Sequence, residues 1–166
     1  MYNLFTKYSW NGMFDKVGNN TLDKVKLAKS EMILAHKGQF RKDGTTPYSV
    51  HPEKVVSILK KLNVKDSDVL CAGYLHDVLE DTPYGEEKIK EKFGDIVLSL
   101  VKELTFKNKI SSEEYLESCH KMSANAKLVK VSDVLANLGD KGDKSEHFIQ
   151  KRVNALVVLL NGLNLN

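Results

Sequence analysis

A short stretch of the chain, residues 73–82, concentrates ionisable side chains in the sequence GYLHDVLEDT. His76-Asp77 and Glu80-Asp81 place one imidazole and three carboxylates within six positions. The preceding run, DVLCAGYL, is nearly all apolar and predicts a buried helix, so these groups need partners unless they form a solvated helix end. An acidic pair at the C-terminus of a helix is unfavourable against the helix dipole, and a nearby cation would offset this repulsion. The pattern therefore favours a metal site.

Two further side chains are candidates to complete this site. His51 precedes Pro52 at the expected start of a helix, and Asp133 lies in the apolar stretch KLVKVSDVLANL, inside the expected bundle. For Asp133 the alternative is a buried aspartate that caps a helix or pairs with a lysine. Together with His76 and Asp77, these residues would form a mixed nitrogen and oxygen ligand set, which suits Mn²⁺, Fe²⁺ or Zn²⁺ better than Ca²⁺.

Such a site is typical of metal-assisted hydrolysis of a phosphate compound. A six-coordinate ion with four protein ligands keeps positions open for water and substrate, and it lowers the pKa of bound water toward ~7. Glu80 lies one helical turn beyond His76-Asp77, with Asp81 beside it, so this pair could orient the attacking water or move its proton. His36, just before Gly38, is interpreted as a packed histidine at a helix end.

The elements that would position these residues are helices. Apolar residues three or four positions apart, with capping residues such as Thr21 and Asp95, predict helices over residues 21–36, 52–62, 66–79, 86–93, 95–104, 112–120, 123–138 and 146–163. Only the aromatic residues among the first twenty suggest a short extended segment. The sequence predicts an all-α, single-domain helical bundle of about seven helices over residues 21–166, preceded by an N-terminal extension of residues 1–20.

Composition limits the classes of protein to which the chain could belong. Its 166 residues fit one domain, and 42% hydrophobic with 28% charged residues is ordinary for a soluble globular protein. The net charge of +3 is spread along the chain, which favours small anionic ligands over nucleic acid. No apolar run reaches the ~20 residues that span a bilayer, and the N-terminus is a poor secretion signal, so a cytoplasmic protein without a membrane partner is expected. Cys71 and Cys119 are expected to be reduced structural thiols.

The order of the motifs resembles a known family. AHKGQFRKDGTTPYSVHP, LHDVLEDT, IKEKFGDIVLSLVKELT and VKVSDVLAN are similar to segments of the hydrolase domain of RelA/SpoT alarmone enzymes, and HDVLEDT looks like the signature of HD-domain phosphohydrolases. Without an attached synthetase domain, the chain resembles the small stand-alone alarmone hydrolases. The resemblance implies an HD-type helical fold and a Mn²⁺-dependent enzyme that removes pyrophosphate from the 3′ position of guanosine tetra- or pentaphosphate (ppGpp or pppGpp).

The resemblance also implies roles for particular residues. One Mn²⁺ per chain, with Fe²⁺ or Zn²⁺ as alternatives, would be bound by four ligands: His51, His76, Asp77 and Asp133. Water would be activated by the acidic pair, Glu80 and Asp81. The nucleotide would be bound by Arg41, Lys42, Tyr48, Lys130 and Asn137. The two loop cations would lie near the phosphates, Tyr48 would wall the pocket, and Asn137 could hydrogen-bond the ribose or the 3′-phosphate side. For Lys130, phosphate contact and helix packing both remain open.

The chain also departs from the family pattern. Val134 and Ala136 stand where family members often have a cation and an aromatic ring. These replacements motivate two alternatives: hydrolysis of another nucleotide, such as an adenine alarmone or the phosphate of a nucleotide cofactor, and a nucleotide-binding module without catalysis. The loop GDKGDKS lacks aromatic residues, although Lys141 and Lys144 could contact phosphates instead. The N-terminal extension could pack on the core, cover the pocket or meet another subunit, and the sequence leaves the oligomeric state open.

Overall fold

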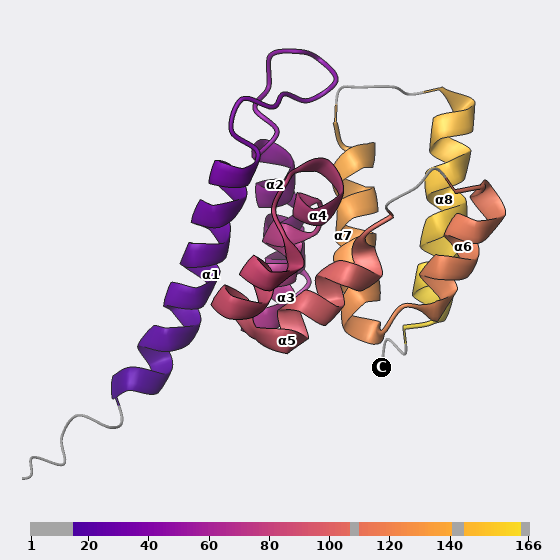
Figure 1. Ribbon diagram of the computed structural model, residues 1–166. Helices are drawn as coiled ribbons and strands as arrows, with labels where there is room; N and C mark the ends of the chain where they lie inside the picture. Colours follow the sequence, from indigo (N-terminus) through magenta and orange to yellow (C-terminus); the bar gives the residue numbers. More distant parts are fainter. Residues whose placement is uncertain (1–14, 107–109, 141–144, 164–166) are drawn as a thin grey trace, which may run out of the picture.

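The computed structural model describes residues 15–106, 110–140 and 145–163 as an assembly of packed helices (Figure 1). These residues form α1 (Asp15–Ala35), α2 (Val50–Lys61), α3 (Ser67–Leu75), α4 (Val78–Asp81), α5 (Glu86–Leu104), α6 (Ser112–Lys121), α7 (Ala124–Leu138) and α8 (Glu146–Asn161). Helix α4 is a single turn of four residues. No named strand occurs among the described residues, so the all-α prediction is confirmed.

Helix α3 is the central element and packs against α1, α2, α5 and α7. All residues from 69 to 75 are buried, which explains why this helix has no polar stripe. Gly73 allows α2 to approach closely, because a Cβ there would lie 2.7 Å from Leu59 Cδ1 and 3.1 Å from Val56 Cγ2. The histidine-aspartate pair at the end of α3 is therefore attached to the most completely buried helix.

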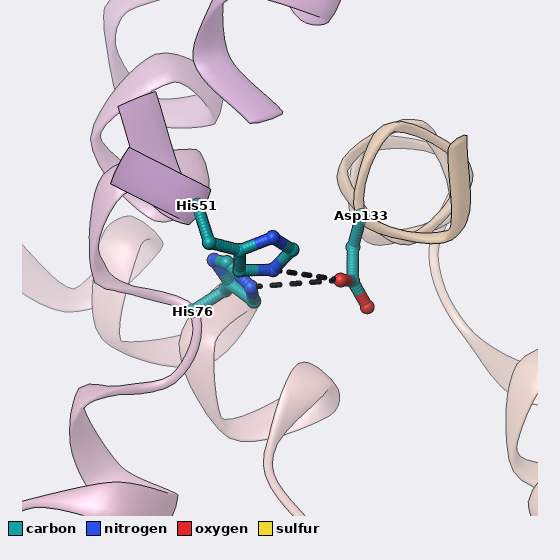
Figure 2. A group of neighbouring side chains, drawn as sticks. All are labelled: His51, His76 and Asp133. Atoms are coloured by element: carbon teal, nitrogen blue, oxygen red, sulfur yellow. Dashed lines mark hydrogen bonds and ion pairs between the residues drawn. The ribbon is translucent and has the colours of Figure 1, made fainter. Parts of the chain in front are cut away.

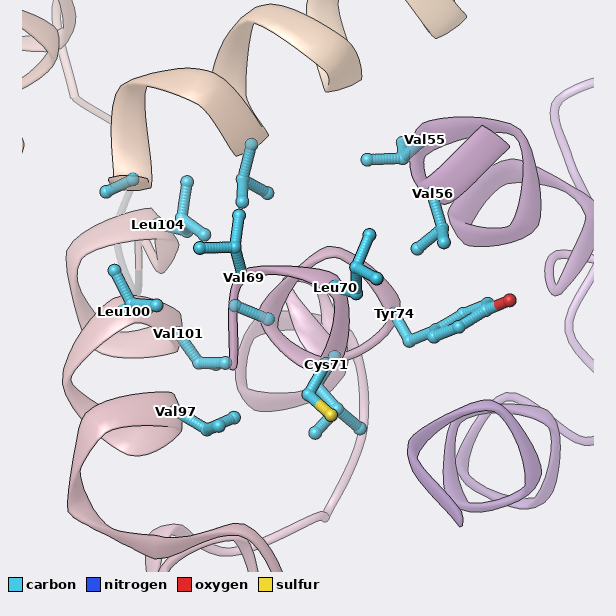
Figure 3. Close-up of a cluster of buried hydrophobic side chains, with 14 of the residues drawn as sticks. Val55, Val56, Val69, Leu70, Cys71, Tyr74, Val97, Leu100, Val101 and Leu104 are labelled. Atoms are coloured by element: carbon cyan, nitrogen blue, oxygen red, sulfur yellow. The ribbon is translucent and has the colours of Figure 1, made fainter. Parts of the chain in front are cut away.

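An apolar core surrounds α3 on several sides (Figure 3). Helix α5 contributes Val97, Leu100, Val101 and Leu104, and α2 contributes Val55 and Val56. Both cysteines are buried and unpaired, as the sequence predicted. Burial raises the pKa of the Cys71 thiol to about 12, so this side chain is a packing residue and a poor nucleophile.

The structure differs from the predicted elements at two places, the start of α1 and the end of α3. Helix α1 begins at Asp15, so residues 15–20 are helical, and Thr21 continues the helix that it was expected to cap. The rest of the predicted extended segment, residues 1–14, lies outside the described residues. The two helices expected on either side of Gly94 are present as the two parts of α5, which is kinked at that glycine because its φ of 85° and ψ of 175° are not helical. The helix expected over residues 66–79 is broken after Leu75, at the candidate site itself.

The break between α3 and α4 has a local cause. The ring Nδ1 of His76 lies 3.0 Å from the carbonyl oxygen of Gly73, an acceptor that a continuing helix would use for the amide of Asp77. The chain instead turns at His76 and Asp77 and resumes as α4. At the other end of α3, Asp66 caps the helix by accepting from the backbone amides of Asp68 and Val69.

The loop between α1 and α2 is ordered by backbone and side-chain hydrogen bonds. Phe40 and Pro47 form an isolated antiparallel bridge, and the amide of Arg41 donates to the carbonyl of Thr46 at 2.8 Å. The carboxylate of Asp43 accepts from the amide and hydroxyl of Thr46, which stabilises the turn. These bonds fix the backbone at both ends of the loop that carries the cationic and aromatic candidates.

None of the helices in the described ranges is long and apolar enough to cross a membrane.

Candidate metal centre

Side chains from three separate parts of the chain converge between α2, α3 and α7. His51 lies in the first turn of α2, His76 follows the last residue of α3, and Asp133 lies in the middle of α7. Figure 2 shows both imidazoles directed at the Asp133 carboxylate, whose Oδ1 is 3.1 Å from His51 Nε2 and 3.9 Å from His76 Nε2. One potential ligand atom from each residue lies within 4.8 Å of the others.

Asp77 joins this group from the turn between α3 and α4. Its Oδ2 is 3.0 Å from His76 Nε2 and 3.9 Å from His51 Nε2. Adjacent residues in a regular helix point about 100° apart, and the turn at residues 76–77 lets both side chains face the same point. The structure therefore brings together all four side chains that the sequence analysis selected as metal ligands.

The hydrogen bonds of the two histidines fit a divalent cation between them. His76 directs Nδ1 to the Gly73 carbonyl, so Nδ1 carries a proton, and in the neutral imidazole Nε2 presents a lone pair to the group. That buried Nε2 has no hydrogen-bond partner, although the Asp77 carboxylate is nearby. A cation at this point would satisfy the nitrogen and match the mixed nitrogen and oxygen donors; without one, a proton on Nε2 would pair with the Asp77 carboxylate.

Electrostatics in this group favour a positive charge. Burial opposes ionisation of Asp77, but the adjacent imidazoles of His76 and His51 outweigh it and lower the pKa of Asp77 to about 2. Burial likewise opposes the charge of Asp133, yet Lys130 and the two histidines hold the pKa of Asp133 well below its usual range. Burial alone would lower the pKa of His76, but the carboxylates of Asp77 and Asp133 raise it to about 9. The two carboxylates thus stay charged and attract either a proton on the imidazole or a metal ion.

A second layer of hydrogen bonds orients Asp133. Lys130 Nζ donates to its Oδ2 at 2.9 Å, and Asn137 Nδ2 donates to its Oδ1 at 2.7 Å. The Asn137 amide oxygen accepts in turn from Arg41 Nη2 at 2.9 Å, and the same nitrogen donates to Asp140 at 2.8 Å. Lys130 and Asn137, one turn on either side of Asp133, therefore hold the carboxylate. Arg41, on the loop between α1 and α2, joins this network through Asn137.

Tyr48 connects the metal group to the acidic pair. Its hydroxyl lies 2.8 Å from Asp77 Oδ2 and 2.8 Å from Asp81 Oδ2, so it can donate to either carboxylate. The ring stacks on buried His36 with centroids 4.5 Å apart. His36 is thus a packed residue, as the sequence analysis expected, and it holds the ring of Tyr48 in place.

These residues border a cavity of about 470 Å³. Nine of the sequence-selected residues line it: Arg41, Tyr48, His51, Asp77, Glu80, Asp81, Lys130, Asp133 and Asn137. Of the remaining two, His76 is buried behind the lining, and Lys42 is exposed on the loop without lining the cavity. Glu80 accepts a hydrogen bond from the amide of Phe106 at 3.1 Å, and its pKa is raised chiefly by burial.

The structure adds five lining residues that the sequence analysis did not select: Phe106, Ile110, Tyr115, Lys151 and Arg152. They come from the segments around α6 and from α8, and no short motif contains them. Conversely, Val134 and Ala136 are buried and do not line the cavity. Lys141 and Lys144 lie outside the described residues.

The sequence and the fold resemble those of known proteins. The family described as HD domain matches residues 30–155. The chain is 35% identical to the human guanosine-3′,5′-bis(diphosphate) 3′-pyrophosphohydrolase, over 77% of this chain and 78% of the relative. It is 34% identical to the GTP pyrophosphokinase of Streptomyces coelicolor over 91% of this chain, but it spans only 19% of that protein's length.

A solved structure, described as a metazoan orthologue of SpoT that hydrolyses ppGpp and plays a role in starvation responses, superposes with a TM-score of 0.74. The sequence identity is 33%, and the superposition covers 86% of this chain and 88% of that one.

Proposed function

The chain belongs to the HD-domain family, and from that premise we propose that it is a metal-dependent hydrolase that removes the 3′-pyrophosphate from guanosine tetra- or pentaphosphate. The products would be pyrophosphate and GDP or GTP. The observation that carries the proposal is the buried group of His51, His76 and Asp133, joined by the partly exposed Asp77, which borders a cavity with both acids and cations in its wall. The human relative and the metazoan structure, whose descriptions name this alarmone as substrate, support the choice of nucleotide.

The proposed metal is one Mn²⁺ per chain, with Fe²⁺ or Zn²⁺ as alternatives that the donor set would also accept. Its ligands would be His51, His76, Asp77 and Asp133. When bound, the cation would polarise the scissile phosphate and acidify the attacking water. The contribution of the chain is orientation: the Gly73 carbonyl sets the tautomer of one imidazole, and Lys130 and Asn137 hold the α7 carboxylate.

Glu80 and Asp81 would handle the protons of the reaction. The water oxygen forms a bond to the phosphorus attached to the ribose, the bond from that phosphorus to the 3′-oxygen breaks, and this oxygen must gain a proton. Both carboxylates line the cavity, and the raised pKa of Glu80 makes it a stronger base than a solvated glutamate. Tyr48, within hydrogen-bonding distance of Asp81, would keep that carboxylate in position.

The cations and the amide nearest the metal group would bind the reacting diphosphate. Arg41 and Lys130 both line the cavity, and each is already oriented by a carboxylate. Asn137, between them, would contact the ribose or the 3′-phosphate, and Tyr48 would wall the pocket. Lys42 follows Arg41 on the same loop and would add positive charge there.

The test is product analysis with purified full chain and Mn²⁺, using guanosine tetraphosphate as substrate. We expect equal amounts of GDP and pyrophosphate. Asp77→Ala should lose both bound metal and turnover, whereas Asp95→Ala, which removes an exposed carboxylate on α5, should lose neither. A metal-loaded protein that releases no pyrophosphate from this substrate would contradict the proposal.

A further inference from the structure

The cations that line the cavity differ in whether a carboxylate already pairs with them. Arg41 and Lys130 are each within 2.9 Å of a carboxylate oxygen. Lys151 and Arg152, both from α8, have no ion pair with any residue in the ranges that the structure describes. Two neighbouring positive charges that line a cavity and have no ion-pair partner in the described ranges are suited to an anionic ligand.

The guanidinium of Arg152 is held in place but incompletely bonded. It lies over the ring of Phe148, one turn earlier on α8, with Cζ 4.7 Å from the ring centroid. Its Nε is buried and has no hydrogen-bond partner. A buried N–H without an acceptor is destabilising, so an acceptor supplied by a ligand in the cavity would bind favourably.

The ring of Tyr115 lies near one lysine of each group. Lys130, which contacts Asp133, has its Nζ 5.6 Å from the centre of the Tyr115 ring, and Lys151 has its Nζ 5.5 Å from the same centre. Figure 1 shows α8 beyond α7 from α2 and α3, which carry the histidines. Lys151 and Arg152 therefore line a different part of the cavity wall from His51 and Asp133.

We propose that Lys151 and Arg152 bind the phosphates of the substrate that do not react, those on the ribose 5′ position. This inference rests on the function proposed above, which places the 3′-diphosphate at the metal group and leaves the second phosphate chain to reach another part of the cavity. Arginine offers a planar pair of donors to a phosphate, and lysine adds a point charge. The pair would make affinity depend on the number of 5′-phosphates.

The test is a substrate series with the same reacting group: guanosine 3′-diphosphates that carry two, one or no phosphates on the 5′ position. For the wild-type protein we expect KM to rise as the 5′-phosphates are removed. Arg152→Gln should raise KM for the doubly phosphorylated substrate about tenfold or more, the loss of one charge-assisted contact, and leave KM for the substrate without 5′-phosphates unchanged. Arg152→Lys should lie between the two.

Controls separate this role from general effects of charge and folding. Lys60→Gln removes one exposed charge from α2 and should not change the series. Binding of GDP and of guanosine without metal, measured by calorimetry, should differ in the wild-type protein and become similar in Arg152→Gln. If that variant misfolds, Lys151→Gln tests the same site.

An equal rise in KM for all three substrates would show that Arg152 contacts a part that they share, such as the base, and would overturn the inference. No loss on any substrate would also overturn it. A wild-type protein inactive on the whole series would instead contradict the proposed function, and the inference that rests on it would fall with it.

Discussion

Replacing Tyr48 by phenylalanine removes one hydroxyl from the candidate site and keeps the ring. The hydroxyl lies 2.8 Å from the carboxylates of both Asp77 and Asp81, while the ring stacks on His36. Loss of a hydrogen bond to a charged group costs about 1.5–3 kcal/mol, and loss of a partner behind a metal ligand typically weakens metal affinity by about 10- to 100-fold. We therefore expect the Mn²⁺ affinity of Tyr48→Phe to fall by about 10- to 100-fold.

The assay is titration of metal-free protein with Mn²⁺ by calorimetry, accompanied by pyrophosphate release. Tyr84→Phe is a matched control, because the Tyr84 hydroxyl donates to the buried carboxylate of Glu31 at 2.8 Å. That variant should lose stability of similar size and retain metal affinity. Should Tyr48→Phe bind Mn²⁺ and turn over substrate like the wild type, Tyr48 does not orient the carboxylates and the reasoning fails.

Three other predictions concern Glu31, Glu80 and the proposed metal. Glu31→Gln should lower the free energy of unfolding by about 3 kcal/mol at pH 7, because the folded-state pKa of Glu31 is about 2, against an ordinary value of 4.5. Burial opposes that shift, but hydrogen bonds from Lys92, Tyr84 and Lys88 outweigh it, so the stabilisation is present above pH 4.5 and is lost as the pH falls toward 2. Denaturant titrations of both proteins at several pH values measure this, and a difference in unfolding free energy that does not change with pH would contradict it. Glu80→Ala should retain metal and slow turnover by about 10²–10⁴, as for loss of a general base, and unchanged kcat would exclude that role. A chelator should abolish turnover and lower the melting temperature, with recovery on adding Mn²⁺, since metal that binds only the folded state stabilises it.

The metal ligands could be selected from the sequence because each has a local signal. His51 stands before a proline that starts a helix. His76-Asp77 follows an apolar run and places two ionisable side chains where packing alone would favour apolar ones. The break after α3 had no such signal, because it depends on a hydrogen bond from the His76 ring to the Gly73 carbonyl. A side-chain bond of this kind competes with the helix for the same carbonyl, and the rotamer that makes it is set by how the His76 ring packs.

The cations of α8 could not be assigned to the cavity from sequence for a different reason. This helix has apolar residues on more than one face: Ala155 and Leu159 are buried, whereas Val153 and Val157 are 42% and 53% exposed. Periodicity fixes which side of a helix is buried only when the apolar stripe is confined to one side. The direction of Lys151 and Arg152 therefore depends on how α8 packs against α6 and α7, which is a tertiary property.

The residues that line the cavity also determine whether the site selects guanine. Val134 and Ala136, whose replacement of a cation and a ring suggested an altered base preference, are 1% and 0% exposed and do not line the cavity. The described wall offers Phe106, Ile110 and Tyr115, and stacking on rings tolerates any base.

Discrimination between bases needs hydrogen bonds to their edges, and Asn137, the neutral amide of the described wall, is engaged by Asp133 and Arg41. If the described wall contacts the base only by stacking, kcat/KM for the adenosine counterpart should lie within about tenfold of that for guanosine tetraphosphate, less than one good base-edge contact would give. A preference of a hundredfold or more, measured with both nucleotides under one set of conditions, would show that an edge-reading contact exists and that stacking and phosphate charge alone do not account for binding.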